Sequence, residues 1–433
     1  MGRLGLLGGL IAAVIGVLGW RFLRVVRTPD DGSRESIPVD GAQAWAEAMV
    51  ASPDHNRLAV RFAPSTIASL ELLPEGRRFY PRIVEDIAAA QHSVHVIQYG
   101  FKPGHVADGF LPVLAERAAA GVPVRMILDA VGSAVSGVSK EMLDGLSAAG
   151  VQITVHDAMP PRRTGTIGDR RIDWTSTGLG HVDHRKLYVI DGRIGWMGGA
   201  GIEDHFEDGR FHDLFVRVTG ALVGQLQATF LGSFAELGGP LPDGALSEYF
   251  PDPADPGAID TTFLMNWPPG WLPVTDAAER LMEGARERLE IMNPYVGDRG
   301  VVDRIVAAAQ RDVTVRMVVP DAVHGNAVAY AAFQHHYDRL LAAGVAIWEY
   351  PALVHAKALV ADDDVLVGTL NLDAWALYRN PEIALHIRDA GVAETFRRDL
   401  FEVDIGASRA GAAAVGQRAR LRNAVLERMA PLL

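Results

Sequence analysis

The stretch FYPRIVEDIAAAQHSVHVIQYGF, residues 79–101, contains both kinds of secondary structure from which this protein is expected to be built. Its first part places apolar residues at helical spacing, which predicts an amphipathic helix. From Ser93 to Tyr99 apolar and polar residues alternate instead, and this pattern predicts a strand. A helix followed directly by a short apolar strand is one step of an α/β sheet.

The same order of elements recurs at once, and again about two hundred residues later. LPVLAERAAAGVPVRMILD (111–129) reads as a second helix and strand, with Gly121 where the helix ends. The second half repeats the pattern in AAERLMEGARERLEIMNPYV (277–296), VVDRIVAAAQRDVTVRMVVP (301–320) and YDRLLAAGVAIWEYP (337–351). A repeat this long is not a solenoid period. We therefore expect a duplicated α/β fold, in which two lobes face each other and share one active site.

The bulk composition limits the classes of function. A chain of 433 residues with 49% hydrophobic residues can supply two domains of ordinary size with a core each. A net charge of -12 disfavours a protein that wraps nucleic acid, since that task needs clustered Lys and Arg. Because the chain has no cysteine, it has no disulfides, thiolate nucleophiles or Cys-ligated metals.

The N-terminus carries an uncharged apolar run from Leu4 to Trp20, which as a helix would measure roughly 26 Å at about 1.5 Å per residue. Trp20 and the charged residues after it do not resemble a cleavage site, so we expect an uncleaved transmembrane anchor over residues 1–27. Arg21, Arg24 and Arg27 outweigh Arg3 on the other side, which favours a cytoplasmic body. The polar stretch after the anchor predicts a linker.

Each half contains one copy of the pattern H-x-K-x-x-x-x-D, namely HRKLYVID (184–191) and HAKALVAD (355–362). Residues two apart in a strand point to the same face, so each copy presents a His and a Lys together. These pairs are His184 with Lys186 and His355 with Lys357. One such pattern is weak evidence, but two copies at matched places in a repeat indicate a catalytic site.

The residue types suit metal-free phosphoryl chemistry. One imidazole can attack phosphorus while the other protonates the departing oxygen, because both protonation states are accessible near neutral pH. The two lysines can neutralise the oxygens of the transition state. The pair His181 and His184 lacks the carboxylates of a metal motif, so we expect no metal and no cofactor.

These residues resemble the two HKD motifs of the phospholipase D superfamily, and the surrounding sequence is similar to its cardiolipin synthase branch. The similar segments are HRKLYVIDGRIGWMGG (184–199), FHDLFVRVTG (211–220), LQATFLGSF (226–234), HAKALVADDDVLVGTLNLD (355–373) and ERMAPLL (427–433). The resemblance implies two α/β lobes around one pocket and a phosphohistidine intermediate. The expected domains are the anchor (1–27), a linker and lead-in (28–60), the first lobe (61–240) and the second lobe with a C-terminal helix (241–433).

The resemblance also implies site residues beyond the two His/Lys pairs. Asp213 is expected to orient His184, the nucleophile, and Glu382 to orient His355, the general acid. Phosphate contacts are expected from both lysines and from three further positions, Gly199, Thr369 and Asn371. Asp191 and Asp362 complete the motifs, but each lies an odd number of residues from its His, so structural support is the better interpretation.

Three departures from the family pattern stand out. The first half has Gly201 where the family has Asn, so one phosphate donor is missing, and Thr369 replaces the usual Ser. The turn after Asp362 is one residue shorter than usual, which fits a tight hairpin.

The motifs alone fit phosphatidyl transfer, phospholipid hydrolysis and nuclease activity. An anchor and an acidic body favour a lipid substrate, and the resemblance implies the cytoplasmic membrane of a bacterium. The resemblance implies cardiolipin synthesis from two phosphatidylglycerols with release of glycerol. A phospholipase D-type hydrolase, a membrane-tethered nuclease and a non-enzymatic scaffold are the alternatives. Arg418, Arg420 and Arg422 lie in an expected C-terminal helix that either contacts anionic lipid or packs on the second lobe of a monomer.

Overall fold

The computed structural model describes residues 36–156, 164–167, 170–173, 182–241, 246–268, 270–321 and 327–411. The expected anchor (1–27), His181 and the expected C-terminal arginine helix lie outside these ranges. Within them, no helix is both long and apolar enough to cross a bilayer.

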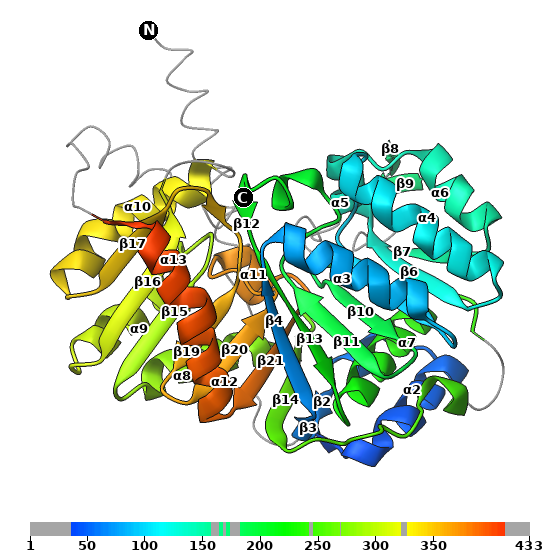
Figure 1. The fold of residues 1–433 in the computed structure, drawn as a ribbon, viewed down its shortest axis with the longest axis horizontal. Coiled ribbons are helices and arrows are strands. Elements are labelled where there is room, and N and C mark those ends of the chain that lie inside the picture. The colour runs from blue at the N-terminus through cyan, green and yellow to red at the C-terminus, as the bar shows by residue number, and fades with distance from the viewer. Residues whose placement is uncertain are drawn as a thin grey trace, which may run out of the picture.

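Two large sheets form the body of the protein and lie side by side (Figure 1). The first has seven strands, in the order β4 (Ser69–Pro74), β13 (Leu214–Thr219), β11 (Ile194–Gly198), β10 (Leu187–Ile190), β5 (Val94–Gln98), β6 (Val124–Asp129) and β7 (Gln152–His156). The second has nine, in the order β22 (Arg409–Ala410), β17 (Ala346–Tyr350), β16 (Thr314–Pro320), β15 (Arg288–Met292), β19 (Ala358–Ala361), β20 (Asp364–Gly368), β21 (Glu382–Arg388), β14 (Ile259–Asn266) and β3 (Ser65–Ile67).

The strand orders confirm the predicted duplication. From β4 to β7 and from β14 to β17, the two sheets have the same sequence of four antiparallel pairings followed by two parallel ones. The predicted strand at Ser93–Tyr99 is observed as β5, and the helix before it as α3 (Gly76–Ala89). Only β3 and β22, at the two edges of the second sheet, lack a counterpart in the described part of the first.

Helices cover both faces of each sheet. On the first sheet, one face is covered by α3, α4 (His105–Ala119) and α6 (Lys140–Ala148), and the other face is covered by α7 (Val223–Glu236). On the second sheet, the corresponding elements are α8 (Pro273–Gly284), α9 (Arg299–Ala309) and α10 (Ala327–Ala342) on one face, and α12 (Ala390–Phe396) and α13 (Glu402–Ala407) on the other. The lead-in helix α2 (Ala42–Ala51) packs on α7.

The largest hydrophobic core joins the two lobes. It combines side chains of α7 with the inward faces of both sheets, including Val189 of β10 and Val360 of β19, while each lobe keeps a separate core on its outer face. Burial of this much apolar surface fixes how the lobes sit against each other. The short strands β12 (Phe211–His212) and β18 (Leu353–Val354) pair in parallel across the same junction, directly beside His355.

Candidate active site

Both signature histidines lie just before a central strand, at the junction of the lobes. His184 and Lys186 precede β10, and His355 and Lys357 lie between β18 and β19. Their main chains therefore bond across the junction: the His184 N–H donates to the Pro381 carbonyl at 3.2 Å and the His355 N–H to the His212 carbonyl at 2.6 Å.

The predicted alternation of side chains holds at both motifs. Arg185 points away from the cavity and donates to Ser233 of α7 at 2.9 Å, and Ala356 is buried in the central core. The His and Lys of each motif are thus left on the side that faces the other lobe.

The acids that hold the two imidazoles are exchanged relative to our prediction. His184 Nδ1 lies 3.0 Å from Glu382 Oε1, and His355 Nδ1 lies 2.6 Å from Asp213 Oδ2. The expected pairs, Asp213 with His184 and Glu382 with His355, are therefore wrong. The reason is the bonding across the junction: each histidine is tied to the residue that precedes the other lobe's acid.

Each acid is buried in its own lobe and contacts the histidine of the other lobe. Asp213 is fully buried, and a Cβ added at Gly199 would lie 2.6 Å from its Oδ1, so this position needs glycine. Glu382, also fully buried, accepts from the hydroxyl of Thr369. Gly199 and Thr369 thus contact the acids, although we expected them to contact phosphate.

The amino group of each lysine contacts the histidine of its own motif. Lys186 Nζ donates to the His184 carbonyl at 2.7 Å, and Lys357 Nζ lies 2.7 Å from His355 Nδ1. Burial lowers the pKa of Lys186 to about 8 and that of Lys357 to about 7. Lys186 also lies over the ring of Tyr99, 5.3 Å from its centroid.

Burial and the neighbouring charges shift the pKa values of the two histidine–acid pairs differently. Burial and then Lys357 lower the pKa of His355 to about 3, and burial together with both lysines lowers that of His184 well below its ordinary value. Burial raises the pKa of Glu382 well above its ordinary value. Burial also acts to raise the pKa of Asp213, but Lys357 and His355 outweigh it, so this pKa is lowered. The pKa values of the two acids are thus shifted in opposite directions.

Asp191 and Asp362 have equivalent structural roles. Each lies at positive φ in the hairpin after β10 or β19. The Asp191 carboxylate accepts the main-chain N–H groups of residues 91, 92 and 93, and that of Asp362 accepts those of residues 286, 287 and 288. These contacts fit the structural interpretation of both residues.

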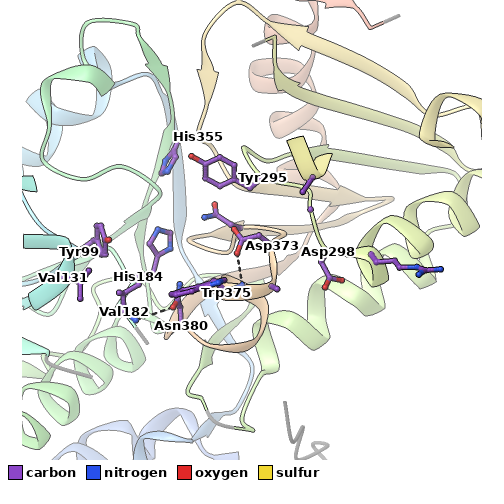
Figure 2. A pocket seen from close by; sticks show the side chains of 15 residues that line it. Tyr99, Val131, Val182, His184, Tyr295, Asp298, His355, Asp373, Trp375 and Asn380 are labelled. Atoms are coloured by element: carbon purple, nitrogen blue, oxygen red, sulfur yellow. Dashed lines mark hydrogen bonds between the residues drawn. The ribbon is translucent and has the colours of Figure 1, made fainter. Parts of the chain in front are cut away.

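A cavity of about 480 Å³ opens over the two histidines (Figure 2). His184, His355 and the predicted Asn371 lie in its wall. The remaining lining residues, which sequence reasoning missed, are Tyr99, Val131, Val182, Tyr295, Gly297, Asp298, Arg299, Ala332, Asp373, Ala374, Trp375 and Asn380. Most belong to the second lobe, so the cavity extends to that side.

A buried charge network behind His184 was also missed. The carboxylate of Asp183 binds the Arg185 guanidinium through two contacts of 2.8 and 2.6 Å, and its main-chain N–H donates to Asp129 at 2.8 Å. His156 lies 3.4 Å from the same Asp129 oxygen. The network fixes the main chain on both sides of His184.

The second lobe has no equivalent of this network. Strand register places four uncharged residues at the matched positions, Pro320, Tyr350, Val354 and Ala356. The two lobes therefore share strand order and motifs but differ in the polarity behind their histidines. Comparison of the two repeats in the sequence could have found this difference.

No group of three or more potential metal ligands occurs among the described residues.

Comparisons with known proteins agree with this site. A profile of the family described as cardiolipin synthase, PLD-like domain, matches residues 83–231 and 279–403. The major cardiolipin synthase ClsA of Bacillus subtilis is 26% identical over 345 residues, which are 77% of this chain and 69% of that protein. The minor cardiolipin synthase ClsB of the same organism is 28% identical over 351 residues, 77% of this chain and 80% of that protein.

Among solved structures, the phosphatidylserine synthase of Haemophilus influenzae Rd KW20 superposes with a TM-score of 0.63. The alignment covers 89% of this chain and 98% of that one at 13% sequence identity, so it establishes a common fold.

Proposed function

This chain belongs to the family of phospholipase D-like cardiolipin synthase domains, and on that premise we propose that it is a phosphatidyltransferase. It joins two phosphatidylglycerols into cardiolipin and releases glycerol. The observation that carries the proposal is the pair of crossed histidine–acid contacts over one cavity, each accompanied by a buried lysine.

The geometry leaves one nitrogen of each imidazole for the substrate. Because Nδ1 of both rings contacts an acid, Nε2 is the atom that can reach phosphorus or a proton. We assign His184 as the nucleophile and His355 as the general acid. The pKa of about 3 of His355 describes the cavity without substrate, and a bound phosphodiester anion favours the protonated imidazole that this role needs. Asp213 supports this assignment, because its pKa is lowered, its carboxylate can stabilise an imidazolium, and it contacts His355.

In the first step, His184 Nε2 attacks phosphorus while the bond to the glycerol oxygen breaks and His355 gives its proton to that oxygen. In the second, His355 takes the proton of the incoming phosphatidylglycerol hydroxyl. The hydroxyl oxygen then bonds to phosphorus, and the P–N bond breaks back to His184. The lysines neutralise the phosphoryl oxygens throughout.

The assignment predicts a trapped intermediate. A His355→Ala variant given a phosphatidyl nitrophenyl ester should release nitrophenolate, since this leaving group needs no proton, and should then stall with the phosphatidyl group on His184. Peptide mass spectrometry under alkaline handling detects the adduct. An adduct on His355 in a His184→Ala variant, with none on His184 in the converse protein, would reverse the two roles.

We further propose that residues 1–27 anchor the enzyme in the cytoplasmic membrane of a bacterium, with the catalytic body in the cytoplasm. The apolar run from Leu4 to Trp20 and the arginines after it support this arrangement. An anchored enzyme meets both lipid substrates within the plane of the bilayer.

The decisive experiment incubates detergent-purified protein with phosphatidylglycerol and follows cardiolipin, glycerol and phosphatidic acid together. We expect cardiolipin and glycerol in equal amounts, undiminished by a strong chelator because the proposed steps use no metal. Phosphatidic acid in place of cardiolipin would identify a hydrolase. Cleavage of a single-stranded DNA control, without lipid turnover, would identify a nuclease.

A further inference from the structure

The second-lobe wall of the cavity carries polar groups that the proposed steps leave unused. Asn371 is 8% exposed, and its Oδ1 is buried without a hydrogen-bond partner among the described residues. Trp375 Nε1 is likewise buried without a hydrogen-bond partner among the described residues. Both residues line the cavity, as does Asp373 between them in the sequence. Buried polar atoms normally have partners, so these groups suggest a missing ligand.

The two carboxylate oxygens of Asp373 have different surroundings. Its Oδ1 accepts the N–H groups of Trp375 and Ala376 at 2.9 and 3.1 Å, which caps the start of α11 (Ala374–Tyr378). Its Oδ2 accepts no hydrogen bond from the described part of the chain, and Figure 2 shows the side chain at the cavity among Tyr295, Trp375 and the histidines. Burial raises the pKa of Asp373 to about 6, and this effect outweighs the opposing charge of Lys357.

The first lobe provides an internal comparison. The bridges of Phe101 to Ile202 and of Val296 to Leu372 place Glu203 at the position matched to Asp373. The Glu203 carboxylate is engaged by Ser136 at 3.2 Å and is not in the cavity wall. Of the two matched carboxylates, only that of Asp373 therefore faces the substrate cavity.

We propose that Asp373 and the Oδ1 atom of Asn371 form a subsite for the hydroxyl groups of the alcohol that leaves or enters the phosphodiester, which leaves the Nδ2 amide of Asn371 for the phosphate contact expected from the sequence. The inference rests on the proposed function, because it supplies the recognition of glycerol that the transfer reaction needs. The subsite lies on the second-lobe side, with His355, the residue that exchanges protons with that alcohol. One subsite thus serves the leaving glycerol and then the terminal glycerol of the acceptor lipid.

The chemistry of the wall favours a polyol over a quaternary ammonium headgroup. A trimethylammonium group has no N–H, so it would leave the Asn371 and Trp375 atoms unpaired. Moreover, Lys186 already lies over the ring of Tyr99, one of the aromatic side chains that an ammonium ligand would need. Hydroxyl groups can donate to Asp373 and both donate and accept at the other positions.

The test compares alcohol release from phosphatidylglycerol and from phosphatidylethanol of the same acyl chains. Ethanol has no further hydroxyl, so the ratio of the two kcat/KM values isolates the subsite. In Asp373→Asn the amide oxygen keeps the cap while Oδ2 is lost, and we expect the ratio to fall about 10- to 100-fold. Asp373→Ser, which also keeps a capping oxygen, should give the same loss. Glu203→Gln is the matched control and should keep the wild-type ratio.

Each outcome is decisive. An equal loss on both lipids in Asp373→Asn and Asp373→Ser would mean that Asp373 only caps α11, and would overturn the proposal. A wild-type preference for phosphatidylcholine over phosphatidylglycerol would overturn it in favour of an ammonium site. If the ratio falls in the Asp373 variants as expected but the wild type makes phosphatidic acid, the transferase function fails while the subsite stands. If it makes cardiolipin and the variants keep the wild-type ratio, the subsite alone fails.

Discussion

At the scale of single residues, the exchange of acids between the lobes changes which variant should affect which step. Asp213 comes from the first lobe but holds His355 of the second, and Glu382 holds His184 in the reverse sense. An acid that orients an imidazole acts through that imidazole. The acid variants therefore report the pairing directly.

With a phosphatidyl nitrophenyl ester, Asp213→Asn should form the His184 adduct at close to the wild-type rate and resolve it roughly 10²- to 10⁴-fold more slowly, because resolution needs His355 as a base. Glu382→Gln should instead slow the burst of nitrophenolate itself. Stopped-flow absorbance separates the two phases. The opposite pattern would restore the uncrossed pairing that we predicted from the sequence.

The lysines predict an alkaline limit to activity. Burial lowers the pKa of Lys357 to about 7 and that of Lys186 to about 8, so in the free enzyme both lose their charge as the pH rises through this range. Because protonated lysines neutralise phosphoryl oxygens, kcat/KM for the nitrophenyl ester should be highest below about pH 7 and fall above it. In Lys357→Arg the falling limb should move to higher pH, since arginine stays charged. A wild-type profile that stays level well above pH 8 would contradict this view.

At the scale of elements, the geometry that the two hairpins share explains the last residue of each motif. Asp191 and Asp362 have φ values of 54° and 50°, and each carboxylate closes a turn onto the strand that begins beside it, β5 or β15. The sequence predicted this support from the odd spacing alone. This role could be predicted because the alternation of side chains along a strand depends only on local sequence.

We expect Asp191→Ala to lower the free energy of unfolding by about 1–3 kcal/mol, since three main-chain donors lose their acceptor. Asp191→Asn should cost less, because asparagine keeps one oxygen and tolerates positive φ. Urea denaturation measures both. The nitrophenolate burst per folded molecule should be unchanged, and a burst lost in a fully folded Asp191→Ala protein would assign the residue a role in the chemistry.

Other parts of the site depend on packing between elements far apart in the sequence. The His/Lys pairs, the duplicated order of strands and Asn371 in the cavity wall were predictable from repeated local patterns. The crossing of the acids was not, since it depends on main-chain bonds from Pro381 and His212 to the opposite lobe. Nor was the task of Thr369, whose hydroxyl is used by Glu382.

At the scale of the whole molecule, duplication has produced two lobes with equal architecture and unequal surroundings. The first lobe places the Asp183–Arg185 ion pair beside its histidine, and the second has Val354 and Ala356 at the same positions. The cavity extends over the second lobe. A symmetric fold thus holds an asymmetric site, and the two histidines to which the proposed reaction gives different roles lie in different surroundings.

The catalytic body and the proposed anchor should be separable. The first described contact of the chain is the pairing of β1 (Ser36–Ile37) with β2 (Arg61–Phe62), so deleting residues 1–27 removes no contact of the described fold. We expect the truncated protein to keep its unfolding midpoint and its activity on the soluble nitrophenyl ester. Most of it should leave the membrane fraction, because the apolar run from Leu4 to Trp20 is lost. Partial retention that salt removes would point to the C-terminal arginines at 418, 420 and 422. A truncated protein that stays wholly bound after both salt and carbonate washes would show that residues 1–27 are not the anchor.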